Sequence, residues 1–236
     1  MNIAILVYPG MTALDAIGPY EVLNGIPDVE LQFVWKTIGP VMTDSGVLAI
    51  GATHTFDEIK RADIVVVPGS SADTVTMMAD SQVLMWLKEI HLTTRFTTSV
   101  CSGALILAAA GLLKGLPATT HWAAMSALRK FGAEPMPNER VVQSGKIITA
   151  AGVSAGIDMA LHLVAQVCGE ERARIIQLLI EYDPRPPFDS GHMSKADTRI
   201  AETARSEMSR RAANPRNLVS VPKLLASQWL ARITHR

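Results

Sequence analysis

The fold follows from one stretch of the sequence, Thr97-Thr98-Ser99-Val100-Cys101-Ser102-Gly103-Ala104-Leu105-Ile106-Leu107. Phe96–Val100 has the length of a buried strand, and Ala104–Leu113 has the alanine and leucine content of a helix. Between them stand Cys101 and small residues. This is the layout of a nucleophile elbow, in which a sharp turn lifts one side chain above the sheet. The glycine two residues before the nucleophile in G-x-S-x-G is absent, so the prediction rests on the succession of strand, cysteine and helix.

Strands and helices alternate on both sides of this elbow, which predicts an α/β fold with a mainly parallel sheet between helices. A kink or break is expected at Gly18-Pro19 in the first helix. Expected strands are Ile3–Val7, Leu31–Lys36, Val47–Ile50, Asp63–Val67, Phe96–Val100 and Ala118–His121, with a hairpin over 141–148. Expected helices are Thr12–Leu23, Ser81–His91, Ala104–Leu113, Trp122–Lys130, Ser154–Val167 and Glu170–Tyr182.

Composition narrows the class of protein. The 236 residues include 22 Lys plus Arg and 22 Asp plus Glu, and this zero net charge argues against a strongly basic nucleic-acid binder. Two cysteines, Cys101 and Cys168, are too few for a secreted disulfide scaffold. No apolar stretch reaches about 18 residues, so no membrane span is expected. We expect a cytoplasmic protein whose core needs no disulfide or metal.

The C-terminal part differs from the rest. The segment Asp183–Pro187 is a rigid, extended break, and residues 194–236 carry nine Lys or Arg against three Asp or Glu. We predict a body over residues 1–193 and a helical extension over 194–236 that packs on the body or on a second subunit. The alternative is a basic arm for nucleic acid, although Trp229 is the only aromatic residue in this extension.

The elbow position predicts a reactive thiol. The N-terminus of the following helix stabilises an anion, and a pKa near ~6 would make about 90% of Cys101 thiolate at pH 7. The alternative is a buried, inert cysteine, the fate predicted for Cys168. A second small-residue turn, Pro68-Gly69-Ser70-Ser71, follows the strand Asp63–Val67. Its backbone N–H groups are candidates for an oxyanion hole.

Several motifs resemble the DJ-1/ThiJ/PfpI superfamily from Met1 to about Phe188. The resemblance implies a flavodoxin-like three-layer sandwich with a reactive cysteine at an elbow, and it is closest to the isonitrile hydratases. The motifs are Leu14-Asp15-Ala16-Ile17-Gly18-Pro19, Val67-Pro68-Gly69, Ser99-Val100-Cys101-Ser102-Gly103, Ala118-Thr119-Thr120-His121-Trp122, Gly156-Ile157-Asp158 and Glu181-Tyr182-Asp183-Pro184-Arg185-Pro186-Pro187-Phe188.

The resemblance implies roles for particular residues. Cys101 would be the nucleophile, Asp15 the paired acid, and Ser102 a hydroxyl-bearing neighbour. Cys101 would attack the terminal carbon of an isonitrile while Asp15 delivers a proton, and water would then release an N-substituted formamide. Gly69 and Ser70 would offer backbone N–H groups, and Ser70 stands where the family usually has a second glycine. Tyr182 either lines the pocket or is a half-buried aromatic, and a homodimer is expected.

Other functions stay open at this point. Asp15 alone is equally typical of a helix cap. Some AraC-type transcription regulators resemble the body, and other branches of the superfamily are redox sensors or glyoxalase-like enzymes. Ser102 stands where the proteolytic branch has histidine, which disfavours a peptidase. No cofactor is expected, because the six histidines lack metal-ligand spacing and no Gly-x-Gly-x-x-Gly follows the first strand.

Overall fold

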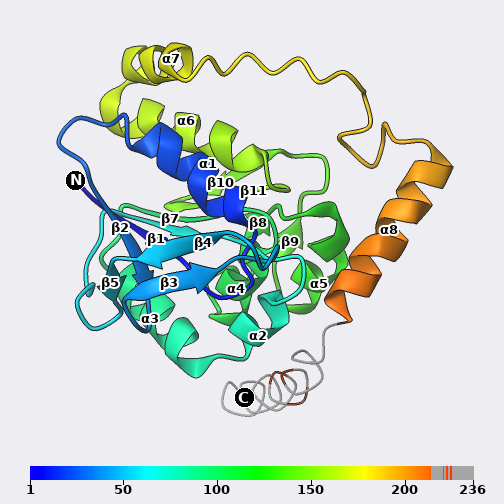
Figure 1. Ribbon diagram of the computed structural model, residues 1–236, viewed down its shortest axis with the longest axis horizontal. Coiled ribbons are helices and arrows are strands. Elements are labelled where there is room, and N and C mark those ends of the chain that lie inside the picture. The colour runs from blue at the N-terminus through cyan, green and yellow to red at the C-terminus, as the bar shows by residue number, and fades with distance from the viewer. Residues whose placement is uncertain (214–219, 221, 223, 225–236) are drawn as a thin grey trace.

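A seven-stranded sheet forms the centre of the computed structural model, which describes residues 1–213, 220, 222 and 224 (Figure 1). The strand order is β10-β11-β7-β6-β1-β2-β5. All neighbouring strands are parallel except β10 and β11, which form the predicted hairpin. The bounds are β1 (Asn2–Leu6), β2 (Glu30–Trp35), β5 (His54–Thr55), β6 (Ile64–Val67), β7 (Phe96–Ser99), β10 (Val141–Ser144) and β11 (Ile147–Ala150).

Helices cover both faces of this sheet, so the predicted three-layer α/β sandwich is confirmed. One face carries α1 (Ala13–Leu23) and α6 (Ala155–Cys168), and α7 (Glu170–Leu179) packs on α6. The other face carries α2 (Thr74–Met78), α3 (Ser81–His91), α4 (Gly103–Ala109), the short 3-10 turn η1 (Trp122–Ala124) and α5 (Met125–Lys130).

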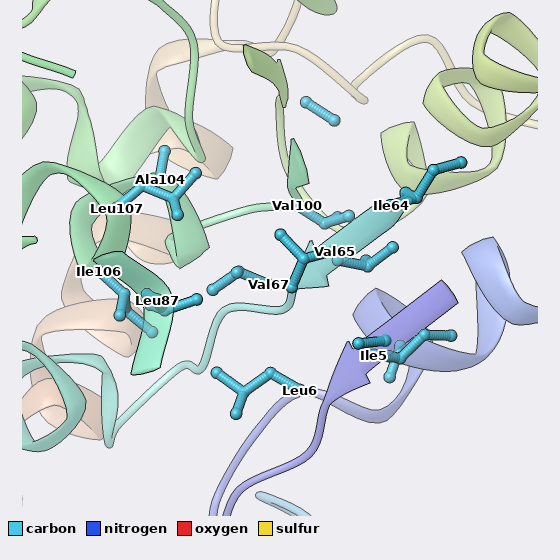
Figure 2. Close-up of a cluster of buried hydrophobic side chains, with 14 of the residues drawn as sticks. Ile5, Leu6, Ile64, Val65, Val67, Leu87, Val100, Ala104, Ile106 and Leu107 are labelled. Atoms are coloured by element: carbon cyan, nitrogen blue, oxygen red, sulfur yellow. The ribbon is translucent and has the colours of Figure 1, made fainter. Parts of the chain in front are cut away.

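The core explains why the central strands read as continuous apolar runs. All four residues of β6 are buried, as are four of the five residues of β1. Figure 2 shows Ile106 and Leu107 of α4 and Leu87 of α3 gathered beside Val67 at the end of β6. Strands covered on both faces need apolar side chains at every position. This packing fixes the carboxyl ends of β1, β6 and β7, from which the site is built.

Some local predictions are wrong, and packing gives the reasons. Helix α1 continues through Pro19, so the break expected at Gly18-Pro19 is absent. The helices α1 and α6 approach closely there, since a Cβ at Gly156 would lie 3.2 Å from the Pro19 ring. The strand predicted at Ala118–His121 is only β8 (Pro117–Ala118), paired with β9 (Glu134–Pro135). The segment predicted at Val47–Ile50 becomes β4 (Ala49–Ala52), which pairs with the unpredicted strand β3 (Gly39–Met42) in a separate hairpin.

The C-terminal extension contains the helix α8 (Thr198–Ala212), as predicted. An extended segment leads from the end of α7 across the molecule to α8, which lies beside α5 (Figure 1). Ala201 is the buried residue of this helix. Most of the remaining extension, including Trp229, lies outside the described residues. Among the residues that the structure describes, no helix is long and apolar enough to span a membrane.

Candidate active site

Cys101 occupies a strained turn between β7 and α4. Its φ is +56°, in a region that non-glycine residues seldom adopt. The turn is held because the Cys101 N–H donates to the Ala151 carbonyl at 3.0 Å and the Thr120 hydroxyl donates to the Cys101 carbonyl at 2.8 Å. Gly103 is required two residues later, since a Cβ there would lie 2.1 Å from the Val67 carbonyl oxygen. The small residues of the elbow therefore allow β6 and α4 to approach.

Asp15 lies directly against this cysteine. The residue belongs to the first turn of α1 and is 0% exposed, whereas Cys101 is 6% exposed. Its Oδ2 accepts a hydrogen bond from the Gly69 N–H at 2.9 Å, so the carboxyl caps the loop after β6 and not its own helix. The Cys101 thiol is the side chain that interacts with the same carboxyl. The fold thus brings together two residues that are far apart in sequence.

Burial changes the ionisation of both groups. Removal from water raises the pKa of Asp15 to about 7, and the nearby Asp44 adds to this, while the Gly69 N–H and the Cys101 thiol oppose it. Burial and the Asp15 charge also raise the pKa of Cys101, although the N–H groups of Val153 and Ser102 favour the thiolate. The predicted lowering of the cysteine pKa is wrong in direction. Burial is the largest cause of the raised pKa, and the hydrogen bonds from Val153 and Ser102 offset it only in part.

The two groups therefore titrate as a coupled pair. Two neighbouring anions in a buried site are costly, so above about pH 7 the pair keeps one proton between the sulfur and the carboxyl. This proton resides either on the sulfur or on the carboxyl, and the second arrangement is the thiolate with a carboxylic acid. The N–H groups of Val153 and Ser102 reduce the energy of that form.

The predicted oxyanion-hole groups have other partners. The Gly69 N–H binds Asp15, and the Ser70 N–H donates to the hydroxyls of Ser102 at 3.0 Å and Thr74 at 3.2 Å. The Ser102 hydroxyl in turn contacts the Thr74 hydroxyl at 2.7 Å and the Ser70 carbonyl at 3.0 Å. These hydrogen bonds join the turn after β6 to the turn before α4, and they hold Asp15 and Cys101 in place. The expectation that Gly69 and Ser70 bind an oxyanion is not supported.

Gly69→Ala is expected to damage both stability and activity. A Cβ at Gly69 would lie 2.5 Å from the Ser102 nitrogen and hydroxyl oxygen, so the turn must move and withdraw its N–H from Asp15. We expect a loss of about 2–4 kcal/mol in the free energy of unfolding, measured by urea denaturation. Gly51→Ala is the matched control, because a Cβ there meets nothing within 4 Å. Equal stability of the two variants would contradict this packing.

Other predicted residues lie apart from the pair. Tyr182 does not line the cavity around Cys101, because its hydroxyl donates to Asp158 Oδ1 at 2.9 Å. Asp158 also forms a salt bridge with Arg140, so both of its oxygens have protein partners. Cys168, predicted to be buried, is exposed at the last position of α6. It is not among the buried residues of the helix, which are Ala155, Gly156, Met159, Ala160, Leu163 and Val164.

Val153 is a site residue that the sequence patterns did not reveal. It has a φ of +33°, rare for a β-branched residue, and its N–H points at the Cys101 sulfur. Val153 follows β11, which is the parallel neighbour of β7. Sequence reasoning could have found this residue, because the loops that follow adjacent parallel strands meet at one edge of the sheet.

A cavity of about 910 Å³ opens above Cys101 and Ser102. Its inner wall is mainly apolar, with Leu105, Trp122 and Met125 among its residues. Burial lowers the pKa of His121 in the same wall, so this imidazole is neutral at pH 7. Within the described part of the chain, no three His, Cys, Asp or Glu side chains are grouped as metal ligands.

The fold and the acid-paired cysteine define a class, namely α/β sandwich proteins with a cysteine elbow. A family model described as the DJ-1/PfpI family matches residues 1–166, and the chain belongs to this family. The resemblance found in the sequence motifs is therefore confirmed.

Three comparisons place the chain more closely within the family. It is 40% identical over 228 residues to the isonitrile hydratase of Pseudomonas putida, covering 92% of this chain and 99% of that protein. The crystal structure of a ThiJ/PfpI family protein from Pseudomonas syringae superposes with a TM-score of 0.85 at 39% identity, covering 89% and 88% of the two chains. The transcriptional regulator CdhR of Pseudomonas aeruginosa is 29% identical over 181 residues, and the match spans 71% of this chain and 51% of CdhR.

Proposed function

We propose that this protein is an isonitrile hydratase, which adds water to an isonitrile to give an N-substituted formamide. The observation that carries the proposal is the buried Cys101–Asp15 pair below an accessible cavity. The match to the Pseudomonas putida isonitrile hydratase supports it, since that match covers 99% of the relative, whereas the match to the regulator CdhR covers about half.

The first step needs a nucleophile and a proton donor at one atom. The terminal carbon of R–N≡C accepts both a sulfur and a proton. In the thiolate and carboxylic acid form of the pair, Cys101 forms the C–S bond while Asp15 gives its proton to the same carbon. The products are a thioimidate, R–N=CH–S–Cys101, and an Asp15 carboxylate. No oxyanion forms here, which agrees with a site whose Gly69 and Ser70 N–H groups already have partners.

The second half of the reaction restores the pair. The Asp15 carboxylate takes a proton from water as the water oxygen bonds to the thioimidate carbon, and Asp15 passes that proton to the nitrogen. Asp15 then accepts the hydroxyl proton as the C–S bond breaks, leaving R–NH–CHO, the Cys101 thiolate and the protonated acid. Each proton is returned, so no cofactor or redox partner is consumed. General acid–base catalysis of this kind contributes on the order of 10²–10⁴-fold.

The activity is expected to rise with pH around neutrality. Below about pH 7 both members of the pair are protonated, and the thiolate is absent. Loss of one proton gives the reactive one-proton state, which persists above pH 8 because the pKa of Cys101 is raised. We expect kcat/KM to increase from pH 6 to pH 8 with a midpoint near 7, measured with a neutral aryl isonitrile. A rate that falls over this range would contradict the coupled pair.

The main alternative within the family is a glyoxalase-like or redox-sensing role. One comparison separates the hydratase from the glyoxalase-like role, because methylglyoxal turnover and isonitrile turnover are measured on the same preparation. We expect consumption of the isonitrile and no turnover of methylglyoxal. The reverse result would replace this proposal. Binding of duplex DNA with a steep salt dependence would favour the regulator-like alternative instead.

A further inference from the structure

The C-terminal helix α8 supplies one wall of the cavity above Cys101. Arg205, Met208, Ser209 and Ala212 line this cavity, and their spacing of three, four and seven residues places them on one face of the helix. Arg211 lies at the border of the same face and also lines the cavity. Figure 1 shows α8 alongside α5, whose Met125 and Ala127 also line the cavity.

Charged side chains of both signs line the cavity, and they come from different elements. Asp44 lies close to the Cys101–Asp15 pair: its Oδ2 accepts from the hydroxyls of Thr12 at 2.8 Å and Ser71 at 3.3 Å, and its charge raises the pKa of Asp15. Arg205 and Arg211 lie on α8. Neither arginine forms a salt bridge with an acidic side chain among the described residues. The α8 wall therefore presents positive charge that the described part of the protein leaves uncompensated.

The cavity is also larger than an isonitrile group requires. Its volume of about 910 Å³ is typical of a site for a whole small organic molecule. A mainly apolar inner wall suits a hydrocarbon or aromatic body with the reactive group at Cys101. Arginine recognises carboxylates through paired hydrogen bonds, so a carboxylate at the opposite end of the substrate would find matching donors.

We propose that the physiological substrates are isonitriles that carry a carboxylate, and that Arg205 and Arg211 of α8 select them. This inference rests on the proposed hydratase function and names its substrate class. The selecting helix lies outside the part of the chain that matches the family model, which ends at residue 166. The part of the chain that matches the family therefore supplies Cys101 and Asp15, and the C-terminal extension supplies the residues that select the substrate.

A substrate pair that differs in one charge tests the proposal. We compare kcat/KM for para-isocyanobenzoate and its methyl ester with the wild-type protein and with the double variant Arg205→Gln/Arg211→Gln. We expect the wild type to favour the carboxylate by about tenfold and the double variant to show a ratio near one. Added salt should reduce the wild-type ratio. Arg210→Gln is the control, because Arg210 is on the same helix but does not line the cavity.

Binding of the product separates failure of this inference from failure of the hydratase function. Calorimetry with para-formamidobenzoate and its methyl ester, the products of the two substrates, needs no turnover. We expect tighter binding of the carboxylate by the wild type, and loss of this difference in the double variant. Equal affinity for the two compounds, or an unchanged ratio in the double variant, overturns the role of Arg205 and Arg211. Carboxylate-selective binding without turnover of either isonitrile overturns the hydratase function alone.

Discussion

Asp15→Asn is expected to make the protein more stable at pH 8 and to remove most of its activity. The carboxyl is fully buried, and folding raises its pKa from 3.8 to about 7. The folded state therefore binds the Asp15 proton more tightly than the unfolded state. The stability linked to this proton is present below about pH 4 and is lost as the pH rises to about 7. Asparagine has nearly the same shape and no charge to bury.

The stability gain depends on pH in a defined way. Each unit of pKa difference corresponds to about 1.4 kcal/mol, so the variant should gain up to about 4 kcal/mol over the wild type at pH 8. At pH 5 the gain should be much smaller, because the wild-type carboxyl is still protonated when folded. Urea denaturation at the two pH values measures this difference. Asp57→Asn is the control, because Asp57 is a surface residue whose side chain is 97% exposed.

The activity should change in the opposite direction. Asparagine cannot give a proton to the isonitrile carbon or take one from water, so we expect kcat/KM to fall by about 10³-fold or more. A gain in stability together with a loss of activity is expected when a residue that destabilises the fold is needed for function. Near wild-type activity in Asp15→Asn would exclude the shared-proton mechanism. Unchanged stability at pH 8 would show that the buried carboxyl is already neutral for another reason.

Cys101→Ala is expected to abolish formamide production while the fold is retained. Alanine removes the sulfur that forms the covalent bond, and the expected loss in kcat/KM is on the order of 10⁴-fold or more. Loss of the isonitrile infrared band, followed in parallel for wild type and variant, measures the effect. Cys168→Ala is a matched control, because Cys168 is the exposed cysteine at the end of α6 and should be dispensable.

Two outcomes would contradict the role of Cys101. Turnover by Cys101→Ala at a rate close to the wild type would show that the sulfur is not the nucleophile. An equal loss in Cys168→Ala would point to a general effect of removing a thiol. Circular dichroism confirms that each variant keeps its secondary structure, so that loss of activity is not loss of fold.

The sheet was predictable because its central strands are buried on both faces. Ile3–Val7 and Ile64–Val67 are apolar throughout, and this pattern is typical of strands that are covered on both faces. Short elements such as β3 and α2 carry no comparable pattern, and they were missed. The break expected at Pro19 is also absent, and the close packing of α6 against this part of α1 could not be foreseen from the local sequence.

The pairing of Cys101 with Asp15 was predictable only through the family motifs. The sequence alone allows a helix cap for Asp15 and a buried thiol for Cys101, and it does not show that α1 and the elbow meet. The pKa of Cys101 was predicted from the helix dipole, whereas its burial and the Asp15 charge decide the direction. The amphipathic pattern of residues 198–212 indicates that the helix packs on something, but it does not indicate the cavity as the location.

The central claim is that Cys101 forms a covalent bond to the isonitrile carbon, and a rapid quench followed by mass spectrometry tests it most directly. During turnover of an aryl isonitrile, the intact protein should gain the mass of one substrate molecule, and peptide mapping should place this gain on the Cys101 peptide. The gain should be absent from Cys101→Ala and should decay as formamide appears. Formamide production without any adduct on Cys101, at acid quench times shorter than one turnover, would contradict the mechanism.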